Sequence, residues 1–169
     1  GTAKAEGRRV IQDIEAGNQA MQLLLGPLRS LQASQRNNRK RVYSPEMHFF
    51  IGNHEQRIER YTNSNPEVQG VIGYHSLDLS GWTVHPFLQP HELGGVSFSH
   101  YFYNPNSGKP FGGSAEYRLN KIKRSFVQGH EQGFKYHIGP IDERRLHGLV
   151  ASSSTTHAQE YNGPQRCVL

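Results

Sequence analysis

The chain has 169 residues, a formal net charge of +5 and a mean hydropathy of −0.72. Its length fits one domain, and its single cysteine, Cys167, excludes an internal disulfide framework and indicates a reducing compartment. No apolar run approaches the roughly 20 residues that cross a membrane, and the basic charge favours anionic partners.

The first predicted element is an amphipathic helix from Lys4 to about Ser34. Gly26-Pro27 should divide it, because proline removes a backbone donor and clashes with the preceding turn. We expect its apolar stripe to pack on a sheet, with partner binding as the alternative. Residues 35–41 follow as a basic, solvated loop. The stripe recurs at three- and four-residue steps and comprises Val10, Ile11, Ile14, Met21, Leu24, Leu25, Leu28 and Leu31.

The next predicted element is a strand at Met47–Ile51, which runs directly into Gly52-Asn53-His54-Glu55. Gly52 permits a tight turn, Asn53 offers a neutral oxygen ligand, and His54 can hold or give a proton near neutral pH. A helix should follow from His54 to Tyr61 and stop before Pro66. Side chains placed at the end of a strand project from a rigid edge, so this junction is a candidate site.

The rest of the chain predicts short strands separated by turns, without an internal repeat or a clear second domain. Ser114 is a candidate N-cap for a helix over 114–123. The tail from Ser152 to Leu169 is polar. The expected strands lie at about 82–84, 87–88, 96–98, 125–128, 135–138 and 146–151.

Three segments, in order, resemble motifs of the calcineurin-like metallophosphoesterases of phage and bacterial type. Residues 52–61 resemble the Gly-Asn-His-Asp/Glu motif and its helix. Val96–His100 resembles the strand that ends in a metal-binding histidine, and Ser125–His130 the strand that leads into Gly-His-x-His. The resemblance implies an α+β fold, a β-sandwich flanked by helices in an αββα arrangement, over residues 1–151, followed by the tail at 152–169.

The resemblance also implies a site and an activity. Asn53, His100 and His130 would ligate one divalent ion (Mn, Zn or Fe), and His54 would protonate the leaving oxygen or bind the phosphate. A complete family member holds two ions and hydrolyses a phosphomonoester or phosphodiester, which includes nucleotides and nucleic acid. Gln132 stands where the second histidine of Gly-His-x-His would bind the other ion, and Glu55 would orient the loop. The implied location is the cytoplasm of a bacterium or of a phage-infected cell.

The chain departs from the family pattern upstream of Gly52. The Asp-x-His and Gly-Asp-x-x-Asp motifs do not occur, and the only aspartates are Asp13, Asp78 and Asp142. We therefore expect an N-terminally incomplete member that lacks the first strand and helix unit, with weak metal affinity and little turnover. The alternative is a non-catalytic remnant or one half of a split enzyme.

A second alternative is a basic nucleic-acid-binding module. Arg118, Lys121, Lys123 and Arg124 form a basic cluster near tyrosines and phenylalanines. A solvated helix face would also explain this cluster. The remaining histidines, His48, His75, His85 and His91 among them, are assigned no role.

Overall fold

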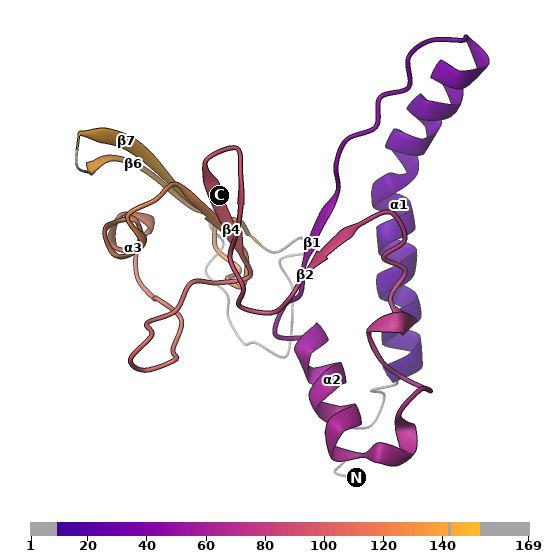
Figure 1. Cartoon of the computed structure of the whole chain (residues 1–169), viewed down its shortest axis with the longest axis horizontal. Helices are drawn as coiled ribbons and strands as arrows, with labels where there is room; N and C mark the ends of the chain where they lie inside the picture. The colour runs from indigo at the N-terminus through magenta and orange to yellow at the C-terminus, as the bar shows by residue number, and fades with distance from the viewer. Residues whose placement is uncertain (1–9, 142, 153–169) are drawn as a thin grey trace. The chain divides into compact units, whose positions relative to one another are not determined.

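The computed structural model describes residues 10–141 and 143–152, and within them the fold is α+β, as expected. Figure 1 shows the elements in chain order. The described chain forms two compact units, one made of residues 10–49 and 57–84 and the other of residues 50–56 and 85–152. We call them unit 1 and unit 2 and describe each by itself.

Unit 1 contains the long helix α1 (Val10–Asn37), which runs without interruption through Pro27. The predicted division at Gly26-Pro27 is therefore wrong. Proline removes one helical hydrogen bond, to the carbonyl of Leu23. Because Leu23 is 79% exposed, water can replace that bond. Among the helices described, none combines the length and apolar character that a membrane crossing requires.

The apolar stripe of α1 was expected to pack on a sheet, but only one residue of the helix is buried. Leu25 is buried, whereas Leu24 is 65% exposed and Leu31 47% exposed. Polar contacts with the turn at 74–78 hold the helix instead. Asn18 Nδ2 donates to the carbonyl of Ser76 at 2.9 Å, and Asn18 Oδ1 accepts from the N–H of Asp78 at 2.8 Å.

The other elements of unit 1 are short. Residues 57–64 complete α2 (Glu55–Ser64), which begins at the turn of Gly52 and stops before Pro66, as predicted. Two 3₁₀ turns follow, η2 (Pro66–Val68) and η3 (Tyr74–Ser76). Strands β1 (His48–Phe50) and β2 (Thr83–His85) form a two-stranded sheet.

Unit 2 is built on a five-stranded sheet with the order β3-β4-β5-β7-β6. The central strands β4, β5 and β7 are parallel, and the outer pairs β3/β4 and β6/β7 are antiparallel. Parallel neighbours end at the same edge of a sheet. The strands are β3 (His91–Leu93), β4 (Val96–Ser99), β5 (Phe126–Gln128), β6 (Lys135–Ile141) and β7 (Arg144–Val150).

Strand β3 was not predicted, and the strand predicted at 87–88 is not present. Leu88 adopts a left-handed conformation with φ of 60°, which suits a turn. Gly94 and Gly95, with φ of 57° and 80°, form the hairpin turn that pairs β3 with β4. Two consecutive left-handed residues are typical of a two-residue hairpin, so this glycine pair marks β3 better than the composition of His91–Leu93 does.

Helix α3 (Ala115–Ile122) packs on this sheet and closes the core of unit 2. Ser114 Oγ accepts from the N–H of Tyr117 at 3.1 Å, which confirms the predicted N-cap. The core combines residues of α3, β5, β7 and the segment after β4. Its buried members are Phe102, Leu119, Phe126, Leu146 and Val150.

Adding a methyl group at Gly148 should destabilise this core. An alanine Cβ there would lie 2.8 Å from Phe126 Cε1 and 3.3 Å from the carbonyl oxygen of Ala115. We expect Gly148→Ala to lower the free energy of unfolding by about 1–3 kcal/mol in urea denaturation. The matched control is Gly133→Ala, whose Cβ would meet nothing within 4 Å. Equal stability of the two variants would contradict this packing.

Candidate metal-binding site

The structure brings Asn53, His100 and His130 together in unit 2. Asn53 lies in the turn after β1, His100 follows β4, and His130 follows β5 by two residues. His100 Nε2 lies 2.7 Å from Asn53 Oδ1 and 3.2 Å from His130 Nδ1. Three residues distant in sequence thus meet around one ring nitrogen. The parallel pairing of Ser99 with Gln128 explains the meeting of the two histidines, because both strands end at this edge.

The turn at Gly52 fits closely against this group. Glu55 Oε2 accepts from the N–H of Gly52 at 2.8 Å, which holds the turn closed. A Cβ on Gly52 would lie 2.7 Å from that oxygen and 3.0 Å from His100 Cε1. Only glycine therefore lets the His100 ring and the Glu55 carboxylate approach the turn together.

His54, the predicted acid, is exposed and lies near both rings. Its electrostatic effect lowers the pKa of His100 and of His130. It is not one of the groups that contact His100 Nε2 directly in the described hydrogen bonds. The geometry therefore separates His54, at the rim, from the three converging residues.

Both converging histidines favour the neutral form. Burial lowers the pKa of His100 to about 4, with a further decrease from His130 and an opposing increase from Glu55. Burial also lowers the pKa of His130, an effect that Glu131 opposes. At neutral pH both rings are uncharged, and a neutral imidazole is the form that ligates a metal.

A partly buried ion-pair network supports the turn that carries His130. The backbone of His130 is left-handed, with φ of 72°, which is uncommon for a residue with a side chain. The next residue, Glu131, pairs with the fully buried Arg118 and with Lys135, whose Nζ lies 2.6 Å away. Burial raises the pKa of Glu131, but hydrogen bonds from Lys135 and Arg118 outweigh it and hold the pKa below its usual value. The carboxylate is therefore charged and fixes the turn.

The three converging atoms can be compared with the ligands of one metal ion. Ligand atoms bound at about 2.1 Å and separated by angles of 90° to 110° lie roughly 3.0–3.4 Å apart. In the metal-free chain the two contacts are hydrogen bonds: the 3.2 Å separation lies within this range, whereas the 2.7 Å separation is shorter, so Asn53 Oδ1 would have to move away from His100 Nε2 for both to bind one ion. The set contains one amide oxygen and two imidazole nitrogens, with no carboxylate. Gln132, the residue in the place of a further family histidine, is exposed.

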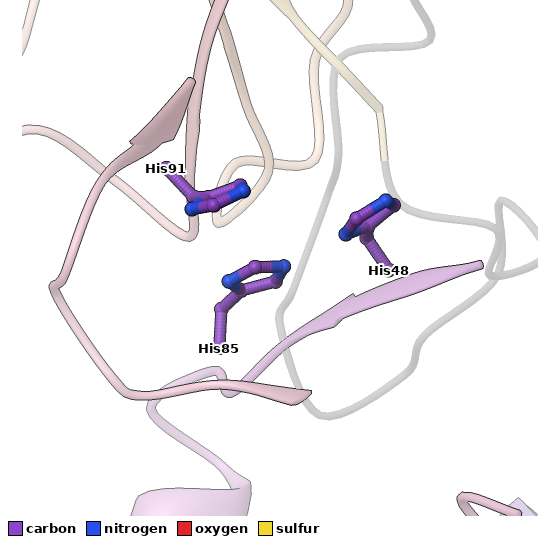
Figure 2. A group of neighbouring side chains, drawn as sticks. All are labelled: His48, His85 and His91. Atoms are coloured by element: carbon purple, nitrogen blue, oxygen red, sulfur yellow. The ribbon is translucent and has the colours of Figure 1, made fainter. Parts of the chain in front are cut away.

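Other histidines of the described chain are also candidate ligands, His48 in unit 1 and His85 and His91 in unit 2. Within unit 2, the rings of His85 and His91 face each other with centroids 4.2 Å apart, as Figure 2 shows. His85 is 7% exposed and also stacks on Phe50, at 4.4 Å. These residues were given no role from the sequence, because their spacing matches no metal-binding motif and only the fold pairs them.

The substitution Gly52→Ala should weaken metal binding without removing a ligand. The added methyl would push His100 or Glu55 from its place, as the short distances to both require. Outer-shell changes of this kind lower metal affinity by about 10–100-fold, which calorimetric titration with Mn²⁺ or Zn²⁺ would measure. Gly17→Ala in α1, where nothing lies within 4 Å, is the control. An unchanged affinity for Gly52→Ala would contradict the geometry.

The metal-free protein should lose stability in acid because of His100. Its pKa is about 4 in the folded chain and 6.5 when unperturbed, so the unfolded chain binds more protons between these values. Stability is therefore fully present above about pH 6.5 and falls as the pH drops to about 4. With solvent screening of the half-buried ring, we expect a loss of about 1–2 kcal/mol. Urea denaturation with EDTA at several pH values would measure it, and an unchanged pH slope in His100→Asn would contradict it.

The arrangement can hold one divalent ion through neutral ligands and leave coordination positions open for water and a phosphate oxygen. His54 lies nearby as a group that can carry a proton. Comparison with known proteins adds nothing to these contacts: no family model, no curated protein and no solved structure matches this chain.

Proposed function

We propose that this chain is a metallophosphoesterase-like domain that binds one divalent metal ion and acts on phosphoesters. The supporting observation is the convergence of Asn53 Oδ1, His100 Nε2 and His130 Nδ1, at 2.7 Å and 3.2 Å, in the combination that the sequence motifs predict. The αββα arrangement belongs to this proposal. The parallel strands β4 and β5, with a candidate ligand just beyond each, support it.

Each residue would have a separate task. A bound divalent ion supplies Lewis acidity toward the phosphate and lowers the pKa of a bound water. Asn53, His100 and His130 hold the ion, and the Glu55 bond to the Gly52 N–H keeps the turn of Asn53 in place. His54, exposed at the rim, gives its proton to the leaving oxygen. The leaving alcohol is thereby released neutral.

The reaction can be tested with bis-p-nitrophenyl phosphate and added Mn²⁺. We expect slow, metal-dependent release of p-nitrophenol that EDTA abolishes. His54→Ala should lower the turnover of a phosphodiester with an alkyl leaving group by about 10²–10⁴-fold, the usual contribution of a general acid, with little change in metal affinity. Its effect on bis-p-nitrophenyl phosphate should be much smaller, because p-nitrophenolate leaves without a proton. His75→Ala, at an exposed histidine of unit 1, is the matched control. Metal-independent hydrolysis, or equal turnover of the alkyl phosphodiester in His54→Ala and the control, would contradict the proposal.

A non-catalytic metal-binding domain is the second candidate, and the ligand chemistry favours it. None of the three converging residues carries a carboxylate, which reduces both the affinity for a hard cation and the neutralisation of its charge. The same titration and assay separate the two functions. If one ion binds in a way that depends on His100 and no hydrolysis is detected, the non-catalytic function is assigned. The same result is expected for one half of a split enzyme.

A further inference from the structure

A second candidate binding site in unit 2 is an open cavity of about 440 Å³ near the C-terminal end of α3. This volume lies within the range of small-molecule sites. Its wall is largely aromatic and apolar, and two cations and the hydroxyls of a serine and a tyrosine complete it. The lining residues used below are Ser97, Phe102, Tyr103, Phe111, Lys121 and Arg124.

The structure divides the basic cluster that the sequence analysis identified. Arg118 is fully buried and pairs with Glu131, so it is not available to a ligand. Lys121 and Arg124 line the cavity, and Lys123 does not. In the part of the chain that the structure describes, neither Lys121 nor Arg124 takes part in an ion pair. Lys121 Nζ also lies over the Tyr117 ring, 5.5 Å from its centroid, a contact that does not neutralise its charge. The two cations that line the cavity are therefore available for an anion.

The other lining groups favour a ring. Tyr103 is 38% exposed, and Phe111 packs against the core from the cavity side. Ser97 is only 5% exposed, and its hydroxyl has no hydrogen bond among those the structure describes, although its N–H donates to the Ser125 carbonyl. Such a hydroxyl can donate to or accept from a polar edge of a bound ring.

We infer that this cavity binds a small anion that carries an aromatic ring, of the nucleoside monophosphate class. The ring would lie against Tyr103 and Phe111, and the phosphate would bind Lys121 and Arg124. Aromatic walls alone would accept any apolar ligand, and two cations alone would bind inorganic phosphate. Their combination within one cavity favours a ligand with both parts. The inference shares no residue with the proposed metal site and does not depend on phosphoester hydrolysis.

Calorimetric titration of the full chain in EDTA with AMP, adenosine and inorganic phosphate tests this inference. We expect AMP to bind at least about tenfold more tightly than adenosine or phosphate. Arg124→Gln should weaken AMP binding about tenfold through the loss of a charge-assisted hydrogen bond, and leave adenosine binding unchanged. Tyr103→Ala should weaken both AMP and adenosine.

Two controls make the test specific to the cavity. Lys123→Gln removes one positive charge beside the cavity without changing its lining, so AMP should bind as tightly as to the unsubstituted chain. His100→Ala should also retain AMP binding, which distinguishes this site from the proposed metal site. The inference is overturned if AMP does not bind, if AMP binds no better than phosphate, or if Lys123→Gln and Arg124→Gln weaken AMP binding equally.

Discussion

Replacing His100 with alanine should lower the affinity for Mn²⁺ or Zn²⁺ by more than about 100-fold, since loss of an outer-shell partner alone lowers affinity by 10–100-fold. His100 Nε2 is the atom that both other candidate ligands face, Asn53 Oδ1 at 2.7 Å and His130 Nδ1 at 3.2 Å. Without this nitrogen, Asn53 Oδ1 and His130 Nδ1 lose the atom that both contact. Calorimetric titration at neutral pH, where both rings are neutral, would measure the loss.

Substitutions of the other candidate ligands should change the metal affinity in a defined order. His130→Ala removes one nitrogen ligand and should also weaken binding strongly. Asn53→Asp replaces the neutral oxygen by a carboxylate in the same position and should strengthen binding, because the added charge attracts a divalent ion. His75→Ala should have no effect. Equal affinity in His100→Ala and His75→Ala, or weaker binding in Asn53→Asp, would contradict the proposed ligand set.

The meeting of these residues follows from features that a sequence can carry. Each junction consists of a short apolar run and then a polar residue: Phe50 precedes the turn of Asn53, and Phe98 precedes His100. Such runs predict strands, and strand ends predict where side chains emerge. Parallel pairing of β4 and β5 then places two of the three junctions at one edge. The strand pattern places several polar residues at strand ends, and the resemblance of three ordered motifs singled out these three; neither predicts their separations.

The errors have two causes, local exposure to solvent and contacts between distant segments. Proline usually breaks a helix, yet α1 continues through Pro27, where Leu23, whose carbonyl loses its helical bond, is exposed. The pairing of His85 with His91 depends on how β2 leads into β3. Likewise, the sequence gives no reason to distinguish Arg118 from Lys121 and Arg124. Only the fold shows that Arg118 is buried and that the other two line a cavity.

Arg118→Met should produce the largest loss of stability among the substitutions considered, about 3 kcal/mol in urea denaturation. The guanidinium is fully buried, pairs with Glu131, and donates to the carbonyls of Gly112 and Gly113 at 3.3 Å and 3.1 Å. Methionine keeps most of the side-chain volume, so the loss reports the polar contacts. This loss of stability is at the lower end of the range of about 3–5 kcal/mol for removing one partner of a buried ion pair. The reason is that Lys135 still reaches both Glu131 and the Gly113 carbonyl.

The partner substitution shows whether the ion pair itself matters. If Arg118 and Glu131 stabilise the fold through each other, Glu131→Gln in the Arg118→Met background should add less destabilisation than Glu131→Gln alone. Arg124→Gln, an exposed cation six residues later, should change the stability by less than about 0.5 kcal/mol. The left-handed backbone of His130 lies next to Glu131, so Arg118→Met should also weaken metal binding by loosening this turn. A variant as stable as the unsubstituted chain, with unchanged metal affinity, would show that the network neither stabilises unit 2 nor positions His130.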